Sequence, residues 1–152
     1  MISEGILEKL QSCLEKYLNG INEFRPISII THKPSDIESI SGSVLSGSLG
    51  LAILILPPTP DEIITNVPGP VFSKIRCEVQ VIEDLAGNKT GCTAMYIAEK
   101  IMHYLHLWRP QLIDWNSKLM LRASKPYDSK RIGNNNVISV FFETHYSLKE
   151  QI

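Results

Sequence analysis

The sequence predicts an α+β fold: a mostly antiparallel sheet of about five strands with two helices packed on one face, in the order α-β-β-β-α-β-β. Three observations support this prediction. The middle of the chain carries an alternating strand pattern, a helical three- and four-residue spacing follows it directly, and helices and strands do not alternate one for one. No repeat or linker divides the 152 residues, so we expect one domain spanning 1–152.

A first amphipathic helix is predicted for residues 2–19. Ser3 is positioned to cap its N-terminus, and Gly20 stands where a helix stop is expected. Its apolar stripe comprises Ile6, Leu10, Cys13, Leu14, Tyr17 and Leu18.

Two strands and two loops are predicted between this helix and residue 70. Residues 27–32 form a strand, and the serine-rich residues 35–48 form a loop. Residues 49–56 are apolar without alternation, which is typical of a strand covered on both faces. Five prolines in residues 57–70 exclude regular pairing through most of that segment, so we expect a stiff loop with Ile63-Ile64 at its tip.

The clearest strand covers residues 72–83, where odd positions are apolar and even positions are polar. The apolar positions are Ile75, Cys77, Val79 and Val81, and the polar positions are Lys74, Arg76, Glu78 and Gln80. One face therefore packs on a core, and the other meets water or a partner. The four polar residues form a possible oligomer face, because sheets with exposed edges and charged faces suit assembly with further copies.

A second helix is predicted after a turn at residues 84–89. Thr90 or Thr93 is placed to cap it, and Arg109-Pro110 ends it. Its apolar stripe is Ala94, Ile97, Ala98, Ile101 and Leu105, extended by Trp108. We expect this stripe to pack against the apolar face of the preceding strand.

The C-terminal part predicts two more strands. Residues 118–124 form the first, residues 125–136 a polar hairpin loop, and residues 137–148 the last and longest strand. Its apolar face carries Ile138, Val140, Phe142, Tyr146 and Leu148.

Composition excludes several classes of protein. A net charge of −1 and a pI near 6.4 give no support for a nucleic-acid or membrane-surface partner. No apolar run approaches 18 residues, and the N-terminus lacks a basic start and an apolar signal core, so we expect an unsecreted protein without a membrane span. Three scattered cysteines argue against a disulfide framework, and Cys13 and Cys77 are expected to be buried thiols.

The candidate chemical groups do not form a recognisable motif. His103 and His106 are placed at i and i+3 of the predicted helix, but no cysteine or carboxylate stands at a spacing typical of the further ligands that zinc needs. Cys92 lies near a helix N-terminus, but no base is placed beside it by the sequence. We therefore predict no catalytic residues, no metal and no cofactor. A small enzyme using His32, His103 or Cys92 remains an alternative.

The predicted loop at residues 57–70 is the strongest candidate for a protein contact. Its residues Asp61, Glu62, Ile63 and Ile64 combine an apolar tip with an acidic pair, and none has a periodic role in the core. The opposing possibility is that Ile63 and Ile64 fold back over the domain's own sheet.

The element order, and one local pattern, resemble the tail-terminator and minor-tail proteins of long-tailed bacteriophages and prophages. The pattern is Arg76-Cys-Glu-Val-Gln-Val-Ile-Glu-Asp84, then Gly87 and Gly91, then a helix with Ala94, Ile97-Ala98 and Ile101 that closes at Leu105 to Trp108. Its sequence match covers about 35 residues, while the element order covers the whole chain; the proline-rich and serine-rich segments depart from the family pattern.

The resemblance implies a single tail-terminator-like domain with no catalytic residues. It implies a hexameric ring that caps the tail tube, ends its polymerisation and docks to the head–neck, with the tail-tube and head–neck proteins as partners. It also implies assembly in the bacterial cytoplasm and incorporation into the virion tail. An oligomeric binding or adaptor domain of unrelated origin is the alternative from a different class.

Overall fold

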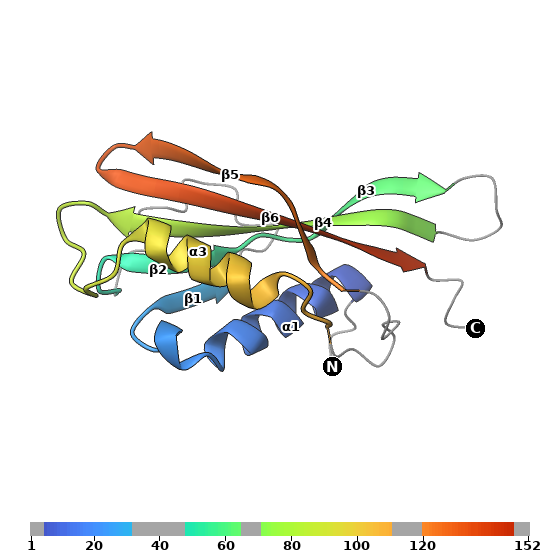
Figure 1. Cartoon of the computed structure of the whole chain (residues 1–152), viewed down its shortest axis with the longest axis horizontal. Coiled ribbons are helices and arrows are strands. Elements are labelled where there is room, and N and C mark those ends of the chain that lie inside the picture. Colours follow the sequence, from blue (N-terminus) through green and yellow to red (C-terminus); the bar gives the residue numbers. More distant parts are fainter. Residues whose placement is uncertain (1–4, 32–47, 65–70, 111–119, 148–152) are drawn as a thin grey trace.

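The structure, a computed structural model, describes residues 5–31, 48–64, 71–110 and 120–147. Its elements are α1 (Ile6–Asn19), η1 (Asn22–Phe24), β1 (Ser28–Thr31), β2 (Leu51–Ile55), β3 (Thr59–Ile64), β4 (Val71–Asp84), α3 (Ala94–Leu105), β5 (Arg122–Ile132) and β6 (Asn135–Ser147). The strands form one sheet in the order β1-β2-β4-β6-β5, with β3 also paired to β4 (Figure 1). Among the described strands, β1 and β2 are parallel and the other pairs antiparallel. This confirms the α+β prediction.

Both helices lie on the same face of the sheet, below it in the view of Figure 1. Their apolar stripes and one face of the strands form a single core. Its buried residues are Leu10, Leu14, Leu18, Phe24, Ile27, Leu51, Ile53, Ile55, Ile75, Cys77, Val79, Val81, Ala94, Ile97, Ala98, Ile101, Leu105, Leu121, Ile138, Val140 and Phe142. The expected packing of the second helix on the central strand is therefore confirmed.

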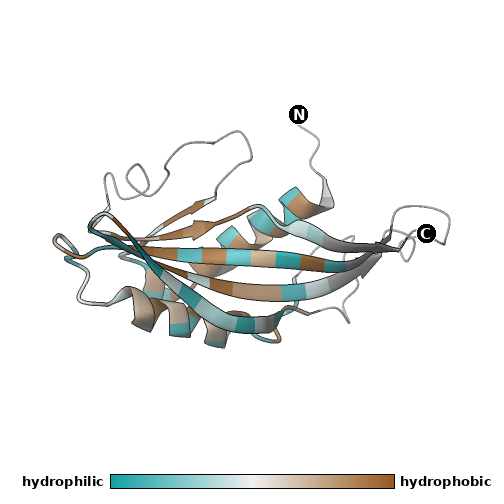
Figure 2. Cartoon of the chain, turned by 90° about the horizontal axis from the view of Figure 1, so that it is seen from above, coloured by the Kyte–Doolittle hydropathy of each residue, from teal (hydrophilic) through white to brown (hydrophobic). Residues whose placement is uncertain are grey.

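The strand β2 is buried on both faces, as its unbroken apolar run predicted. All five of its residues are buried, and Ala52 and Leu54 belong to a second cluster with Ile82 and Val137. Figure 2 shows hydrophobic and hydrophilic residues alternating along the longer strands, which is the pattern of a sheet with two unlike faces.

The caps of the helices follow from local chemistry. The hydroxyl of Thr93 accepts a hydrogen bond from the backbone N–H of Tyr96 at 3.1 Å, so Thr93, and not Thr90, caps α3. Gly5 stands at the N-cap of α1 without a side-chain bond, and Gly20 at its C-cap. The predicted cap Ser3 lies outside the described residues. Among the described residues, no helix is long and apolar enough to cross a membrane.

The turn between β4 and α3 is held against the start of β2. The N–H of Asp84 donates to the carbonyl of Gly50 at 2.9 Å, and the N–H of Lys89 to that of Leu49 at 2.8 Å. Gly50 has φ +90°, and a Cβ there would lie 2.3 Å from the carbonyl oxygen of Gly87. Glycine is therefore required at position 50 by both conformation and space.

A buried carboxylate joins this turn to α3. Glu83, at the end of β4, is 8% exposed. Its Oε1 accepts from the N–H of Ala94 at 3.1 Å, and its Oε2 accepts from Asn88 Nδ2 at 2.8 Å. One side chain thus satisfies a free donor in the first turn of α3 and fixes the approach of the loop.

The prediction of a loop through residues 57–70 is wrong over Thr59–Ile64, which form β3. These residues pair with β4, with register shifts on both sides of Glu62. Proline is tolerated in an edge strand, where its missing N–H faces away from the ladder, so Pro60 does not prevent pairing. Residues 65–70 lie outside the described part of the chain.

The predicted hairpin loop at 125–136 is also wrong, because β5 and β6 continue through it to a tight turn at Gly133-Asn134. Pro126 lies in β5, beside β6 and at the edge of the sheet. The register shifts between Ala123 and Lys125, and again between Lys125 and Asp128. These bulges let β5 remain paired with β6 on both sides of Pro126. β5 begins at Arg122, not at residue 118.

Candidate protein-contact surfaces

The predicted oligomer face lies on the side of β4 that points away from the helices. Its neighbours in sequence, Ile75 to Val81, alternate into the core. Lys74 Nζ is 3.4 Å from Glu143 Oε2 on β6, and Gln80 Nε2 donates to Glu78 Oε2 at 3.0 Å. Arg76 is exposed. The face is a polar, charge-bearing surface, as expected; its role in contact is a proposal.

The predicted contact residues Asp61 to Ile64 lie on β3, so the segment predicted to make a contact is a strand and not a loop tip. Glu62 is the Cα partner of Lys74, and Ile63 the partner of Phe72. Beyond α3, β3 projects together with the adjoining ends of β4 and β6 (Figure 1). The backbone of β3 therefore forms part of an arm that extends from the helix-covered body.

The far edge of the sheet is formed by β5, which is almost entirely exposed. Every side chain in Arg122–Ile132 is exposed except the partly buried Ala123. Lys125 Nζ lies 4.0 Å from the centre of the ring of Phe141, a side chain of β6 that is 9% exposed. The sequence predicted a strand only as far as Ser124 and a loop from Lys125 onward, so it missed most of this 11-residue strand.

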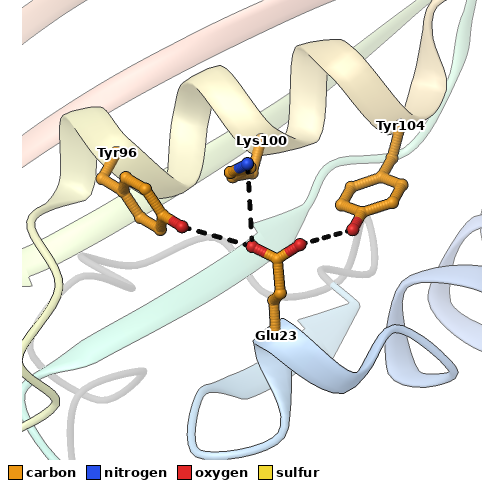
Figure 3. A network of polar contacts seen from close by, with 4 residues as sticks. All are labelled: Glu23, Tyr96, Lys100 and Tyr104. Atoms are coloured by element: carbon orange, nitrogen blue, oxygen red, sulfur yellow. Dashed lines mark hydrogen bonds and ion pairs between the residues drawn. The ribbon is translucent and has the colours of Figure 1, made fainter.

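A cluster that the sequence analysis missed joins η1 to α3. Figure 3 shows Tyr96, Lys100 and Tyr104 of α3 converging on the carboxylate of Glu23. Tyr104 donates to Oε1 at 2.5 Å, Tyr96 donates to Oε2 at 3.3 Å, and Lys100 Nζ is 3.9 Å from Oε2. The spacing of Tyr96, Lys100 and Tyr104 at i, i+4 and i+8 indicates that they share one face of α3, but no sequence pattern indicates that Glu23 contacts this face.

The same contacts shift two pKa values in opposite directions. The hydrogen bond from Tyr104, helped by the nearby Lys100 charge, lowers the pKa of Glu23 against the opposing effect of partial desolvation. The hydrogen bond to Glu23 raises the pKa of Tyr104. The cluster is accessible to solvent. Because Glu23 belongs to η1 and its partners to α3, these contacts link the two helical segments.

A second link between the helices is aromatic. The rings of Tyr17 on α1 and Trp108 after α3 stack with centroids 4.6 Å apart, and the hydroxyl of Tyr17 donates to the carbonyl of Tyr104 at 3.2 Å. Cys13, Lys16, Tyr17 and Trp108 line a shallow depression. The prediction of a buried thiol is correct for Cys77, where burial raises the pKa to about 12, but Cys13 is only partly buried.

The histidines and Cys92 are not brought together. Cys92 precedes the first turn of α3 and His103 lies in its last turn, so about 13 Å of helix separates them. His106 Nδ1 accepts from the N–H of Ala123 at 3.1 Å, and the His103 ring meets the edge of Tyr104. His32 lies outside the described residues. Over the described ranges, no group of three metal-ligating side chains occurs.

A scan against protein-family models and a search of curated proteins gave no match. Among solved structures, the chain is similar to a chain in the virion of a native gene transfer agent particle, with TM-score 0.67, 15% identity, and coverage of 95% of this chain and 99% of that one. A second solved protein, which has no descriptive name, is similar with TM-score 0.50, 9% identity and coverage of 93% and 96%. At these identities the likeness establishes a shared fold over nearly the whole of each chain.

Proposed function

We propose that this protein is a structural component of a phage-like virion. The observation that carries the proposal is its fold, which matches a gene transfer agent virion chain from end to end. A match over 95% and 99% of the two chains extends along nearly their whole length and is not limited to one common motif. The role proposed is structural, with no catalytic, cofactor or metal site.

Within the virion, we propose the role of tail terminator. Copies of the chain form a hexameric ring that caps the tail tube, ends its polymerisation and offers a docking face to the head–neck. The resemblance of Arg76–Asp84 and the following helix to that family supports this role. The exposed strand β5 at one edge of the sheet, and the polar face of β4, provide surfaces for ring contacts. Assembly takes place in the bacterial cytoplasm before the ring enters the virion tail.

The ring is tested by the mass of the purified protein. Light scattering at several protein concentrations should give six times the 17.1 kDa chain mass, and negative-stain images should show rings with a lumen. A monomer or a closed dimer at all concentrations contradicts the ring and favours the adaptor alternative.

Termination is tested on growing tubes. Added to polymerising tail-tube protein, the wild-type protein should shorten the tubes and leave density at one end, and deleting its gene should give overlong tubes. The Ile101→Ala variant is the control for unfolding. Its loss of core packing should reduce its effect on tube length only in proportion to the fraction of protein that is unfolded. Unchanged tube length with stable rings contradicts the terminator role and leaves another structural role in the virion.

A further inference from the structure

We propose that the sheet face turned away from the helices binds the phosphate backbone of duplex DNA without reading its sequence. The contact surface, called here the basic face, consists of Arg76 on β4 with Arg122, Lys125 and Lys130 on β5. All four side chains are exposed. The proposal goes beyond the structural role in a virion and does not depend on the ring, because each copy of the chain carries this surface.

Arg76 and Arg122 lie on either side of one glutamate. Glu143 of β6 is the Cα partner of both, so the three residues form a row across β4, β6 and β5. Neighbouring strands are about 4.8 Å apart, which places the two arginines about 10 Å from each other. Glu143 is already engaged, since its Oε2 lies 3.4 Å from Lys74 Nζ.

Lys125 and Lys130 extend the basic face along β5. Lys125 is opposite Phe141 and Lys130 is opposite Val137, and residues opposite each other in an antiparallel pair lie on the same face. The alternate residues of β6 belong to the core between the sheet and the helices; they are Ile138, Val140 and Phe142. The basic face is therefore on the side of the sheet away from both helices (Figure 1).

The positive charge of the basic face is not neutralised within the chain. Among the described residues, none of its four cations lies in an ion pair. Lys125 Nζ lies over the ring of Phe141, a contact that leaves its charge uncompensated. The carboxylates on this side of the sheet are Glu78, Asp128 and Glu143. The net charge of −1 does not reveal the basic face, because it is a property of the whole chain.

The chemistry of this surface favours a phosphate backbone over an acidic protein. Interfaces between proteins have an apolar core within a polar rim, whereas interfaces with DNA are more polar and more positively charged. Here the central aromatic side chain, Phe141, is buried beneath Lys125, and the adjacent Gln80 and Glu78 hydrogen-bond each other at 3.0 Å. Pro126 and two register shifts in β5 also discourage pairing with a strand of another protein.

The arrangement of the cations indicates contact with phosphates and not with base edges. From Arg122 to Lys130 the strand advances by up to about 26 Å, so the charges form a line and not a pocket for one anion. Contacts of this kind position a protein on DNA but carry no sequence information. They also release counterions, so four of them predict a slope of about −3 to −4 for the logarithm of affinity against that of salt concentration.

Fluorescence anisotropy with a short labelled duplex of mixed sequence tests the proposal. At about 50 mM salt, Lys125→Gln with Lys130→Gln should weaken binding by at least about tenfold and reduce the magnitude of the salt slope by about 2, because two phosphate contacts are lost. Arg76→Gln with Arg122→Gln should have the same effect. A second duplex of unrelated sequence should bind the wild type equally well. Circular dichroism and light scattering check that fold and mass are those of the wild type.

The matched control is Lys16→Gln with Arg25→Gln, which makes the same change in net charge at exposed positions of α1 and the residue after η1. Its affinity and salt slope should equal those of the wild type. A wild type that does not bind the duplex at low salt overturns the proposal, and so do basic-face variants that bind no more weakly than the control.

Two further outcomes also contradict DNA binding. Polyglutamate that displaces the duplex at the same concentration of negative charge would identify an acidic protein as the partner. Binding to phosphatidylserine vesicles without binding to the duplex would identify a membrane surface. The ring is tested separately by the mass of the protein, so the failure of either proposal is distinguishable from that of the other.

Discussion

The hydroxyl of Tyr104 donates a 2.5 Å hydrogen bond to Oε1 of Glu23, which ties the last turn of α3 to η1. The two residues are 81 positions apart in sequence. Glu23 has a pKa below its ordinary 4.5, so its contribution to stability is present above pH 4.5 and is lost as the pH falls through its folded value. Tyr104 has a pKa above 10.0, so its contribution is present below pH 10 and is lost as the pH rises through its folded value.

Tyr104→Phe should therefore lower stability most between about pH 5 and pH 9, and the difference from the wild type should shrink as the pH falls from 4.5 through the lowered pKa that Glu23 has in the folded protein. Urea melts across the pH range provide the measurement. Tyr96→Phe, which removes a longer bond of 3.3 Å, is the control and should have a smaller effect. A difference that stays constant down to pH 3 would show that the bond is not linked to the ionisation of Glu23.

Glu83→Ala should cost about 1–3 kcal/mol, because it leaves the buried N–H of Ala94 without its acceptor and removes one of the two acceptors of the Asn88 amide. Glu83→Gln keeps one acceptor oxygen and should cost less. Chemical denaturation measures both. Equal losses for the two variants would show that charge, and not the acceptor atom, makes this contribution.

Gly50→Ala should destabilise the protein by about 3 kcal/mol or more, since it combines a strained φ with a clash against Gly87. Gly91→Ala separates the two effects: Gly91 has φ +81° but open space around its Cβ position, so only strain of about 1–2 kcal/mol is expected. Thermal or urea melts that rank the two variants equally would contradict the close backbone approach.

Ile101→Ala should cost about 2–5 kcal/mol, because Ile101 is 0% exposed within the main core. Glu99→Ala, at an exposed position of the same helix, is the control and should stay within about 0.5 kcal/mol. A loss below about 0.5 kcal/mol for Ile101→Ala in urea melts would place the stripe outside the core.

Replacing Ile63 and Ile64 with serine should leave monomer stability within about 0.5 kcal/mol while assembly or tube capping fails, if β3 is a contact strand. Leu49→Ser with Leu85→Ser, at residues 47% and 46% exposed, is the matched control and should preserve both. Light scattering and melts are measured on the same samples. A double variant that melts early but assembles whenever folded would show that these residues cover the domain's own core.

Most of the fold follows from periodicity, because long amphipathic elements are specified by the residues they bury. The alternation from Ile75 to Val81 and the helical stripe from Ala94 to Leu105 both predicted the core face correctly. The unbroken run at Leu51–Ile55 likewise predicted burial on both faces. In each case the local pattern and the tertiary environment agree.

The errors occur in edge strands, where packing does not impose a pattern. β3 and β5 contain prolines, bulges and charged residues, so their sequences look like loops, and pairing with β4 or β6 is what makes them strands. The Glu23 cluster escaped prediction for a related reason, since it joins segments 73 to 81 residues apart. Single-sequence patterns contain no information on such distant pairing.

The strand order has a consequence for how the chain folds during synthesis. The sheet is centred on β4 and β6, and β6 (Asn135–Ser147) follows β4 only after α3 and β5. When β4 leaves the ribosome, β2 can pair with it on one side. β6, its neighbour on the other side, has not yet been synthesised. Roughly 60 residues separate the end of β4 from the end of β6, which corresponds to about 3–12 s of translation. During that interval one side of the central strand has no hydrogen-bonding partner from its own chain, so neighbouring nascent chains on a polysome compete for it and general chaperones have a defined period in which to act.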